Sequence, residues 1–136
     1  MTPKFRGKSI DEKNKGQWVY GNLIIDGEKA VIVNGIVCCG EDYITLEDWC
    51  PVDLNTVGQY TNQKDLIGNE IFEGDIISWE YWDEFTDRGK AQVVNEESSW
   101  KLLDVKTGKE VWDSFSDCVS NCTVLIESNI YKKSKI

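Results

Sequence analysis

Residues 52–77 read VDLNTVGQYTNQKDLIGNEIFEGDII, and this stretch decides the fold class. Gly58, Gly68 and Gly74 divide it into short runs rich in the β-branched and aromatic residues that favour strands. The last glycine begins a Gly-Asp step that opens a β-branched run at Asp75, a common start for a strand of an SH3-like barrel. The pattern predicts strands at 56–60, 70–72 and 75–81.

Two turn dipeptides organise the residues before this stretch. Asp26-Gly27 and Asn34-Gly35 accept the positive φ angles that tight hairpin turns require. They separate three apolar runs, so we expect a three-stranded β-meander with strands at 18–25, 29–33 and 36–39. Residues 41–56 are mixed and fit either a short helix or a strand.

Short strands also dominate the residues after the stretch. We expect the Thr107-Gly108 turn to join two of them, an acidic loop at 82–89, and a short turn or helix at 115–121. Many short strands at this spacing predict a mainly β chain with little helix, built as a small barrel or sandwich. The expected division is 1–50, a basic arm with the meander, and 51–136, the barrel. The further strands are predicted at 90–94, 100–105, 110–112 and 123–131.

Composition excludes several classes of chemistry. The chain has 136 residues, a net charge of -9 and no histidine, so it has no imidazole general base and no histidine metal ligand. The acidic balance argues against direct nucleic-acid binding. The first ten residues are polar and no run approaches 18 apolar residues, so we expect no signal peptide, no membrane segment and a cytoplasmic location. Five cysteines, an odd number, predict reduced thiols.

The negative charge is concentrated in residues 41–87, which hold thirteen acidic side chains against one basic side chain, Lys64. Both flanks are mildly basic. A solvated acidic face is the plainest interpretation; neutralisation by the flanks, by another subunit or by a basic partner are the alternatives. We expect a basic N-terminal arm, with Lys4, Arg6 and Lys8, to meet the acidic block of a neighbouring subunit.

No group of side chains predicts a catalytic, cofactor or metal site. Asp65, Glu70, Glu73 and Asp75 lie close in sequence, yet their spacing fits neither an EF-hand nor a hydrolase pattern. The CxxxC cysteines at 118 and 122 are expected to be small buried hydrophobic residues rather than metal ligands.

Aromatic and acidic residues mix in the predicted 82–89 loop. Trp79 and Tyr81 share a strand face with Ile77 and are expected in the core. The loop residues are better placed for contact, because exposed aromatic side chains are favoured interface anchors. Together with Lys4, Arg6 and Lys8, the candidate interaction surface is Trp82, Asp83, Glu84, Phe85 and Asp87.

The 52–77 stretch resembles the signature of the YopX family, small proteins carried by phages and prophages. The opening (Lys4-Phe5-Arg6 and residues 18–23) and the closing residues 128–131 are also similar to the family. Asn62 and Ser128 stand where the family usually has glycine, and Gly68-Asn69 reverses a common Asn-Gly. The resemblance implies an SH3-like barrel in the C-terminal part, homo-oligomeric assembly and no established enzymatic activity. The signature residues are Gly58, Gln59, Tyr60, Gly68, Glu73, Gly74 and Asp75.

These observations favour a phage- or prophage-encoded interaction module, not an enzyme, that self-associates and binds a host or phage protein. The alternative is an acidic decoy that imitates DNA and blocks a nucleic-acid-binding host protein. A carboxylate-metal nuclease is a third hypothesis, which requires two carboxylates converging on one ion.

Overall fold

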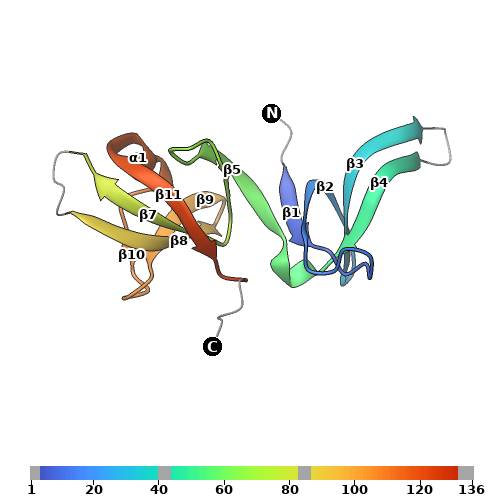
Figure 1. Ribbon diagram of the computed structural model, residues 1–136, viewed down its shortest axis with the longest axis horizontal. Helices are drawn as coiled ribbons and strands as arrows, with labels where there is room; N and C mark the ends of the chain where they lie inside the picture. The colour runs from blue at the N-terminus through green and yellow to red at the C-terminus, as the bar shows by residue number, and fades with distance from the viewer. Residues whose placement is uncertain (1–3, 40–43, 83–86, 132–136) are drawn as a thin grey trace. The chain divides into compact units, whose positions relative to one another are not determined.

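The structure, a computed structural model, describes the backbone of residues 4–39, 44–82 and 87–131 and, within these ranges, all side chains except those of 34–48. The described part is mainly β, with two antiparallel sheets and one short α-helix (Figure 1). This confirms the predicted fold class at that level. The chain divides into two compact units, residues 1–60 and 61–136. No helix in the described ranges is long and apolar enough to cross a membrane.

The first unit is a sheet in which strands neighbour one another in the order β4-β3-β2-β1-β5. Trp18–Asp26 forms the predicted strand, and Gly27 turns the chain into the next strand with φ of +64°. The elements are β1 (Phe5–Lys8), β2 (Trp18–Asp26), β3 (Lys29–Cys39), β4 (Ile44–Val52), the 3-10 turn η1 (Leu54–Thr56) and the start of β5 (Gly58–Lys64).

The ends of β1 and β4 bond to each other, which curls the sheet over a small core. Ser9 and Val52 form a bridge, and the Ile10 amide donates to the Pro51 carbonyl at 3.0 Å. Inside, Ala30, Ile32 and Val52 are buried together. A Cβ atom at Gly7 would lie 2.9 Å from Cγ2 of Val52, so the close approach of β1 requires glycine at that position.

Two expectations for the first unit are wrong. Asn34-Gly35 is not a turn, because β3 runs unbroken through it and Gly35 pairs with Glu47 of β4. Pairing with a long neighbouring strand outweighs the local turn preference of the dipeptide. The basic N-terminal residues are not an arm either: Phe5–Lys8 is a strand between β2 and β5.

The second unit contains a sheet with strands in the order β10-β9-β8-β7-β11. Four strands form a meander, and the last strand returns to pair with the first of the four. The end of β5 lies in this unit beside β6. The remaining elements are β6 (Glu70–Phe72), β7 (Asp75–Tyr81), β8 (Arg88–Glu96), β9 (Ser99–Asp104), β10 (Glu110–Val111), α1 (Phe115–Asn121) and β11 (Cys122–Asn129).

The short helix packs onto the core of the second unit. The Asp117 amide donates to Oγ of Ser114 at 3.1 Å, which caps the helix at its start. Its Phe115 and Cys118 side chains are buried in the apolar cluster. The remaining buried members of the cluster come from the strands and from the start of β11: Ile71, Ile77, Ala91, Val93, Leu102, Cys122 and Val124.

The division between the units follows Tyr60, ten residues beyond the expected boundary at 50. Residues after 50 stay with the first unit because they pair with its strands: Val52 opposes Ala30, and Gly58 opposes Arg6.

Candidate functional site

The signature turn at Glu73-Gly74 connects three segments of the second unit through backbone hydrogen bonds. Gly74 has φ of +92°, its amide donates to the Val93 carbonyl at 2.9 Å, and its carbonyl accepts from the Ile130 amide at 2.9 Å. A Cβ atom there would lie 2.9 Å from the ring of Tyr131. The turn therefore requires glycine for two reasons, its backbone angle and the ring against it.

Asp75 follows this turn and is almost fully buried, with 1% of its surface exposed. Its Oδ2 accepts a hydrogen bond from the Phe72 amide at 2.8 Å. The carboxylate thus fixes the β6–β7 turn from within, which is a structural task.

The Asp65 carboxylate likewise stabilises the loop before β6 by accepting hydrogen bonds from backbone amides. Its Oδ1 accepts from the amides of Ile67 and Asn69, at 3.1 Å and 2.8 Å, and its Oδ2 accepts from the Ile126 amide of β11 at 3.2 Å. Gly68 completes the loop with φ of +91°.

The remaining signature residues lie along β5. Gly58 and Gln59 pair with Arg6 and Phe5 of β1, and the Tyr60 amide donates to the Lys4 carbonyl at 2.7 Å.

One departure from the family pattern is explained by the backbone of β5. Asn62, which replaces the usual glycine, has φ of +67°. Asparagine tolerates this left-handed conformation better than most other residues.

The signature is therefore largely a set of contacts that close the fold. Asp65 and Asp75 turn their carboxylates toward backbone amides rather than toward each other. Within the described ranges, no three acidic or cysteine side chains are grouped to hold a metal ion. Since Asp65 and Asp75 are buried, with 7% and 1% of their surface exposed, the 41–87 block is not a uniform solvated acidic face.

The basic residues of β1 lie on aromatic rings of β2. The Arg6 guanidinium carbon is 4.2 Å from the centroid of the Trp18 ring, and Lys8 Nζ is 5.4 Å from the same ring. Lys4 Nζ lies 5.9 Å from the Tyr20 ring. These cation–π contacts hold the three side chains against β2, and Arg6 is itself buried, with 5% of its surface exposed.

The structure describes only the ends of the predicted aromatic-acidic surface. Asp83, Glu84 and Phe85 lie outside the described residues. Trp82 is exposed and its Nε1 donates to Oγ1 of Thr123 at 3.1 Å. Asp87 is also exposed, and its carbonyl accepts from the Tyr81 amide at 2.9 Å.

Trp79 and Tyr81 pack against the second core, as expected. Both contact Trp112, whose φ of +65° is unusual for a bulky residue. The Trp79 and Trp112 rings meet edge to face at a centroid distance of 5.3 Å, and Tyr81 stacks on Trp112 at 5.9 Å.

The cysteines of the second unit are placed as small apolar side chains. Cys118 and Cys122 are buried, and burial raises the pKa of both thiols. A raised pKa keeps the nucleophilic thiolate scarce at neutral pH.

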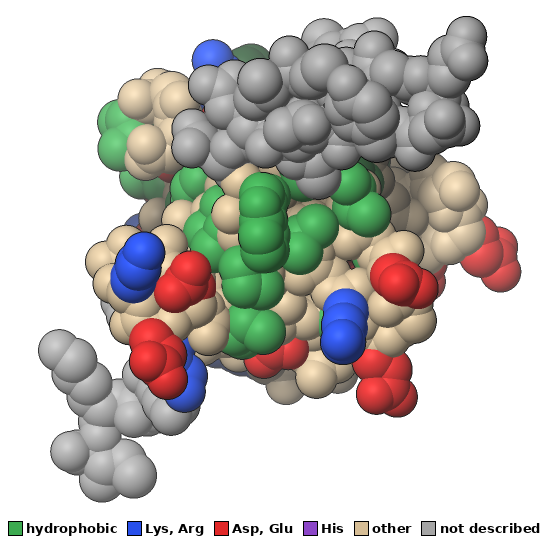
Figure 2. All heavy atoms as spheres, turned by 90° about the vertical axis from the view of Figure 1, so that its right-hand side faces the viewer, with side chains coloured by type: hydrophobic (Ala, Val, Ile, Leu, Met, Phe, Trp, Pro, Cys, Tyr) green, Lys and Arg blue, Asp and Glu red, His purple; other side chains and the backbone are tan. Residues whose placement is uncertain are grey.

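The residue pattern alone did not single out the outer face of the first sheet. Tyr20, Ile24 and Trp49 expose 41%, 45% and 59% of their surface. Ile24 opposes Val31, which opposes Pro51, so apolar side chains continue across three strands. We call Tyr20, Ile24, Val31, Trp49 and Pro51 the outer apolar face. Figure 2, which looks at the end of the chain occupied by the first unit, shows hydrophobic side chains gathered into a patch bordered by charged ones.

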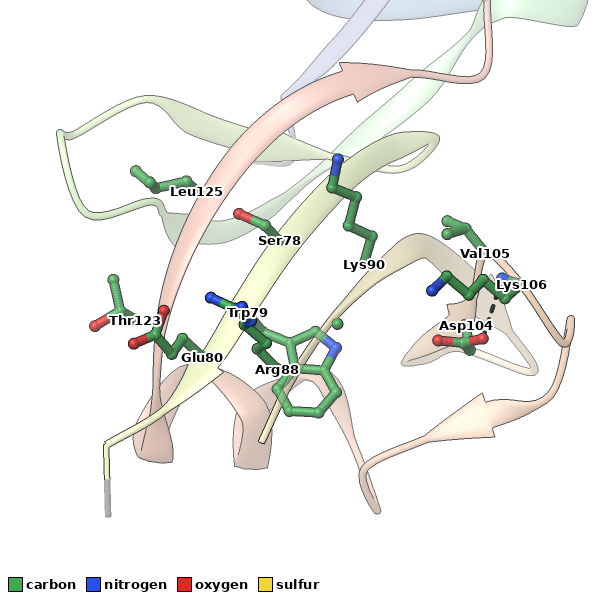
Figure 3. Close-up of a pocket in the computed structure, with 11 residues that line it drawn as sticks. Ser78, Trp79, Glu80, Arg88, Lys90, Asp104, Val105, Lys106, Thr123 and Leu125 are labelled. Carbon is green, nitrogen blue, oxygen red and sulfur yellow. Dashed lines mark hydrogen bonds between the residues drawn. The ribbon is translucent and has the colours of Figure 1, made fainter. Parts of the chain in front are cut away.

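A groove of about 680 Å³ lies on the second unit, along the face of β11, β7 and β8 that is turned away from the core. Figure 3 shows Ser78 and Glu80 on β7, Thr123 and Leu125 on β11, and Lys106 on the turn after β9. This site was also missed, because it depends on the pairing of β11 with β7.

A family model described as "YopX protein" matches residues 4–136. The chain belongs to the YopX family. No curated protein and no solved structure matches it.

Proposed function

We propose that this YopX protein is a non-enzymatic interaction module, encoded by a phage or prophage, that self-associates through the outer apolar face of its first unit. Asp53, Asp65 and Asp75 bind backbone amides of turns and loops, and Cys118 and Cys122 pack in the core of the second unit. The exposed Tyr20 and Trp49 are residue types that anchor protein interfaces.

The outer apolar face carries the proposal. Tyr20, Ile24 and Trp49 are three of the exposed large hydrophobic side chains of the described residues, and they come from two strands of one sheet. Leaving such an apolar face in water is unfavourable, and pairing it with the same face of a second copy would remove both faces from water. The predicted meeting of basic and acidic surfaces between subunits would add charge complementarity at its margin.

The test places a charge in the middle of this face. Ile24→Lys should lower the mass measured by sedimentation equilibrium toward the 15.5 kDa of one chain. Ile10→Lys is the matched control, because Ile10 is 53% exposed but lies after β1, off this face. A wild-type chain that sediments as a monomer, or an Ile24→Lys mass equal to that of wild type, would contradict the proposal.

We further propose that the second unit is an SH3-like barrel in a cytoplasmic protein with a host or phage partner. Support for the barrel comes from the strand order: a four-stranded meander, a short helix, and a last strand beside the first. The decoy hypothesis has less support, because Asp53, Asp65 and Asp75 use their carboxylates to bind the chain's own amides.

A further inference from the structure

We propose that the groove on the second unit binds an extended acidic peptide segment of a partner protein, through the cationic side chains of Arg88, Lys90 and Lys106. This inference is independent of self-association through the first unit.

The two lysines of the groove form no salt bridge with the described residues, although the charge of Lys106 helps to lower the pKa of Asp104, whereas a neighbouring lysine forms two salt bridges. Lys101 Nζ lies 3.2 Å from Glu110 and 3.7 Å from Glu96, and the hydrogen bond to Glu110 raises its pKa. In the described part of the chain, no carboxylate lies within ion-pair distance of Lys90 or Lys106. The unit therefore neutralises one lysine with its own carboxylates and leaves those of the groove available to a ligand.

The backbone holds the two lysines in place. The Val105 amide donates to the Lys90 carbonyl at 3.1 Å, which ties the turn after β9 to β8. Within that turn, Asp104 Oδ2 accepts from the Lys106 amide at 3.0 Å (Figure 3) and from the Thr107 amide at 2.9 Å. Because these amides stabilise the carboxylate form, the pKa of Asp104 is lowered and the turn keeps its geometry at neutral pH.

Two carboxylates also line the groove and reduce its positive charge. Asp104 is engaged by its own turn, and Glu80 is the cross-strand partner of Arg88. Three cations against two carboxylates still leave the groove with net positive charge on a chain of net charge -9. This net positive charge would attract a ligand that carries carboxylates.

The spacing of the cations matches a strand-like peptide. Arg88 and Lys90 are two residues apart on β8, so their side chains project from one face about 6.6 Å apart. Carboxylates at alternate positions of an extended peptide have the same repeat. Leu125 and Val105 lie at two sides of the groove and offer contact to apolar side chains, while Ser78 and Thr123 supply hydroxyl groups. A free phosphate group has neither the repeat nor an apolar part.

The test measures peptide binding by fluorescence anisotropy. The probe is a fluorescein-labelled peptide of sequence Glu-Val-Glu-Leu-Glu-Gly, and its partner peptide has glutamine at every glutamate. We expect saturable binding of the acidic peptide only, about tenfold weaker for the Lys90→Gln/Lys106→Gln variant. Lys109→Gln is the matched control, since Lys109 is exposed nearby but does not line the groove, and it should change affinity less than about twofold.

A variant with the opposite expected effect on affinity distinguishes binding in the groove from nonspecific electrostatic attraction. Glu80→Gln removes a negative charge from the groove and should tighten binding. Far-UV circular dichroism of each variant checks that the sheet is intact. Equal binding of the two peptides, a Lys109→Gln loss equal to that of the double variant, or weaker binding by Glu80→Gln would overturn the proposal. Displacement of the peptide by inorganic phosphate or oligothymidylate at constant ionic strength would assign the groove to another anion and overturn it as well.

Discussion

Gly68 and Gly74 have nearly the same φ angle, so comparing alanine substitutions at the two positions measures the energetic cost of placing a Cβ atom against the Tyr131 ring. Gly68 has φ of +91° and Gly74 has φ of +92°, yet a Cβ atom meets nothing within 4 Å at Gly68 and the Tyr131 ring at 2.9 Å at Gly74. Alanine at either position costs about 1–2 kcal/mol of backbone strain. At Gly74 alone it also overpacks a contact, which adds about 1–3 kcal/mol.

We therefore expect Gly74→Ala to lower the free energy of unfolding by about 2–5 kcal/mol and Gly68→Ala by about 1–2 kcal/mol. The assay is urea unfolding followed by near-ultraviolet circular dichroism, which reports on the packed Trp79–Trp112 pair of the same unit. Repeating Gly74→Ala in a Tyr131→Ala background separates the two contributions, because removing the ring leaves only backbone strain.

Equal destabilisation of the protein by Gly68→Ala and Gly74→Ala would contradict a steric contribution from Tyr131. So would a cost of Gly74→Ala that is the same with and without the Tyr131 ring.

Two other changes test how turns and loops are held. Asp65→Ala should lower the free energy of unfolding by about 2–4 kcal/mol, because it removes the acceptor of three backbone amides, whereas Asp65→Asn keeps Oδ1 and should cost less in the same urea assay; a larger cost for asparagine would contradict this assignment. Glu97 and Ser98 form the β8–β9 turn with φ of +51° and +67°, so Glu97→Asn/Ser98→Gly should raise the unfolding free energy by about 1–2 kcal/mol, and an unchanged or lower midpoint would count against turn strain.

The sequence was most informative where local preference and tertiary pairing agree. The strand at 75–81 has the expected bounds, and residues 115–121, predicted as a short turn or helix, form a helix, because a Gly-Asp step and a Ser114 cap set these elements locally. Asn34-Gly35 has the composition of a turn, but its place inside the hairpin of β3 and β4 depends on a partner strand that local preference does not reveal.

The surfaces were harder to predict than the strands. Tyr20 and Ile24 alternate with core residues along β2, so the alternation of side chains along a strand would have placed both on one face of the sheet. The groove could not be found in this way, because Leu125 reaches Ser78 only through the pairing of β11 with β7. Which strands become neighbours is a property of the whole unit.

The bond between Asp65 and the Ile126 amide joins residues 61 positions apart. During synthesis, the loop at Asp65 leaves the ribosome long before the strand that will supply its last hydrogen-bond donor. The second unit therefore cannot complete its sheet until the residues up to Asn129 have emerged, and closing so long a segment carries an entropic cost that slows folding. Until then the edge of β7 stays uncovered, which makes the interval before β11 arrives the period in which a nascent chain is most prone to wrong strand pairing.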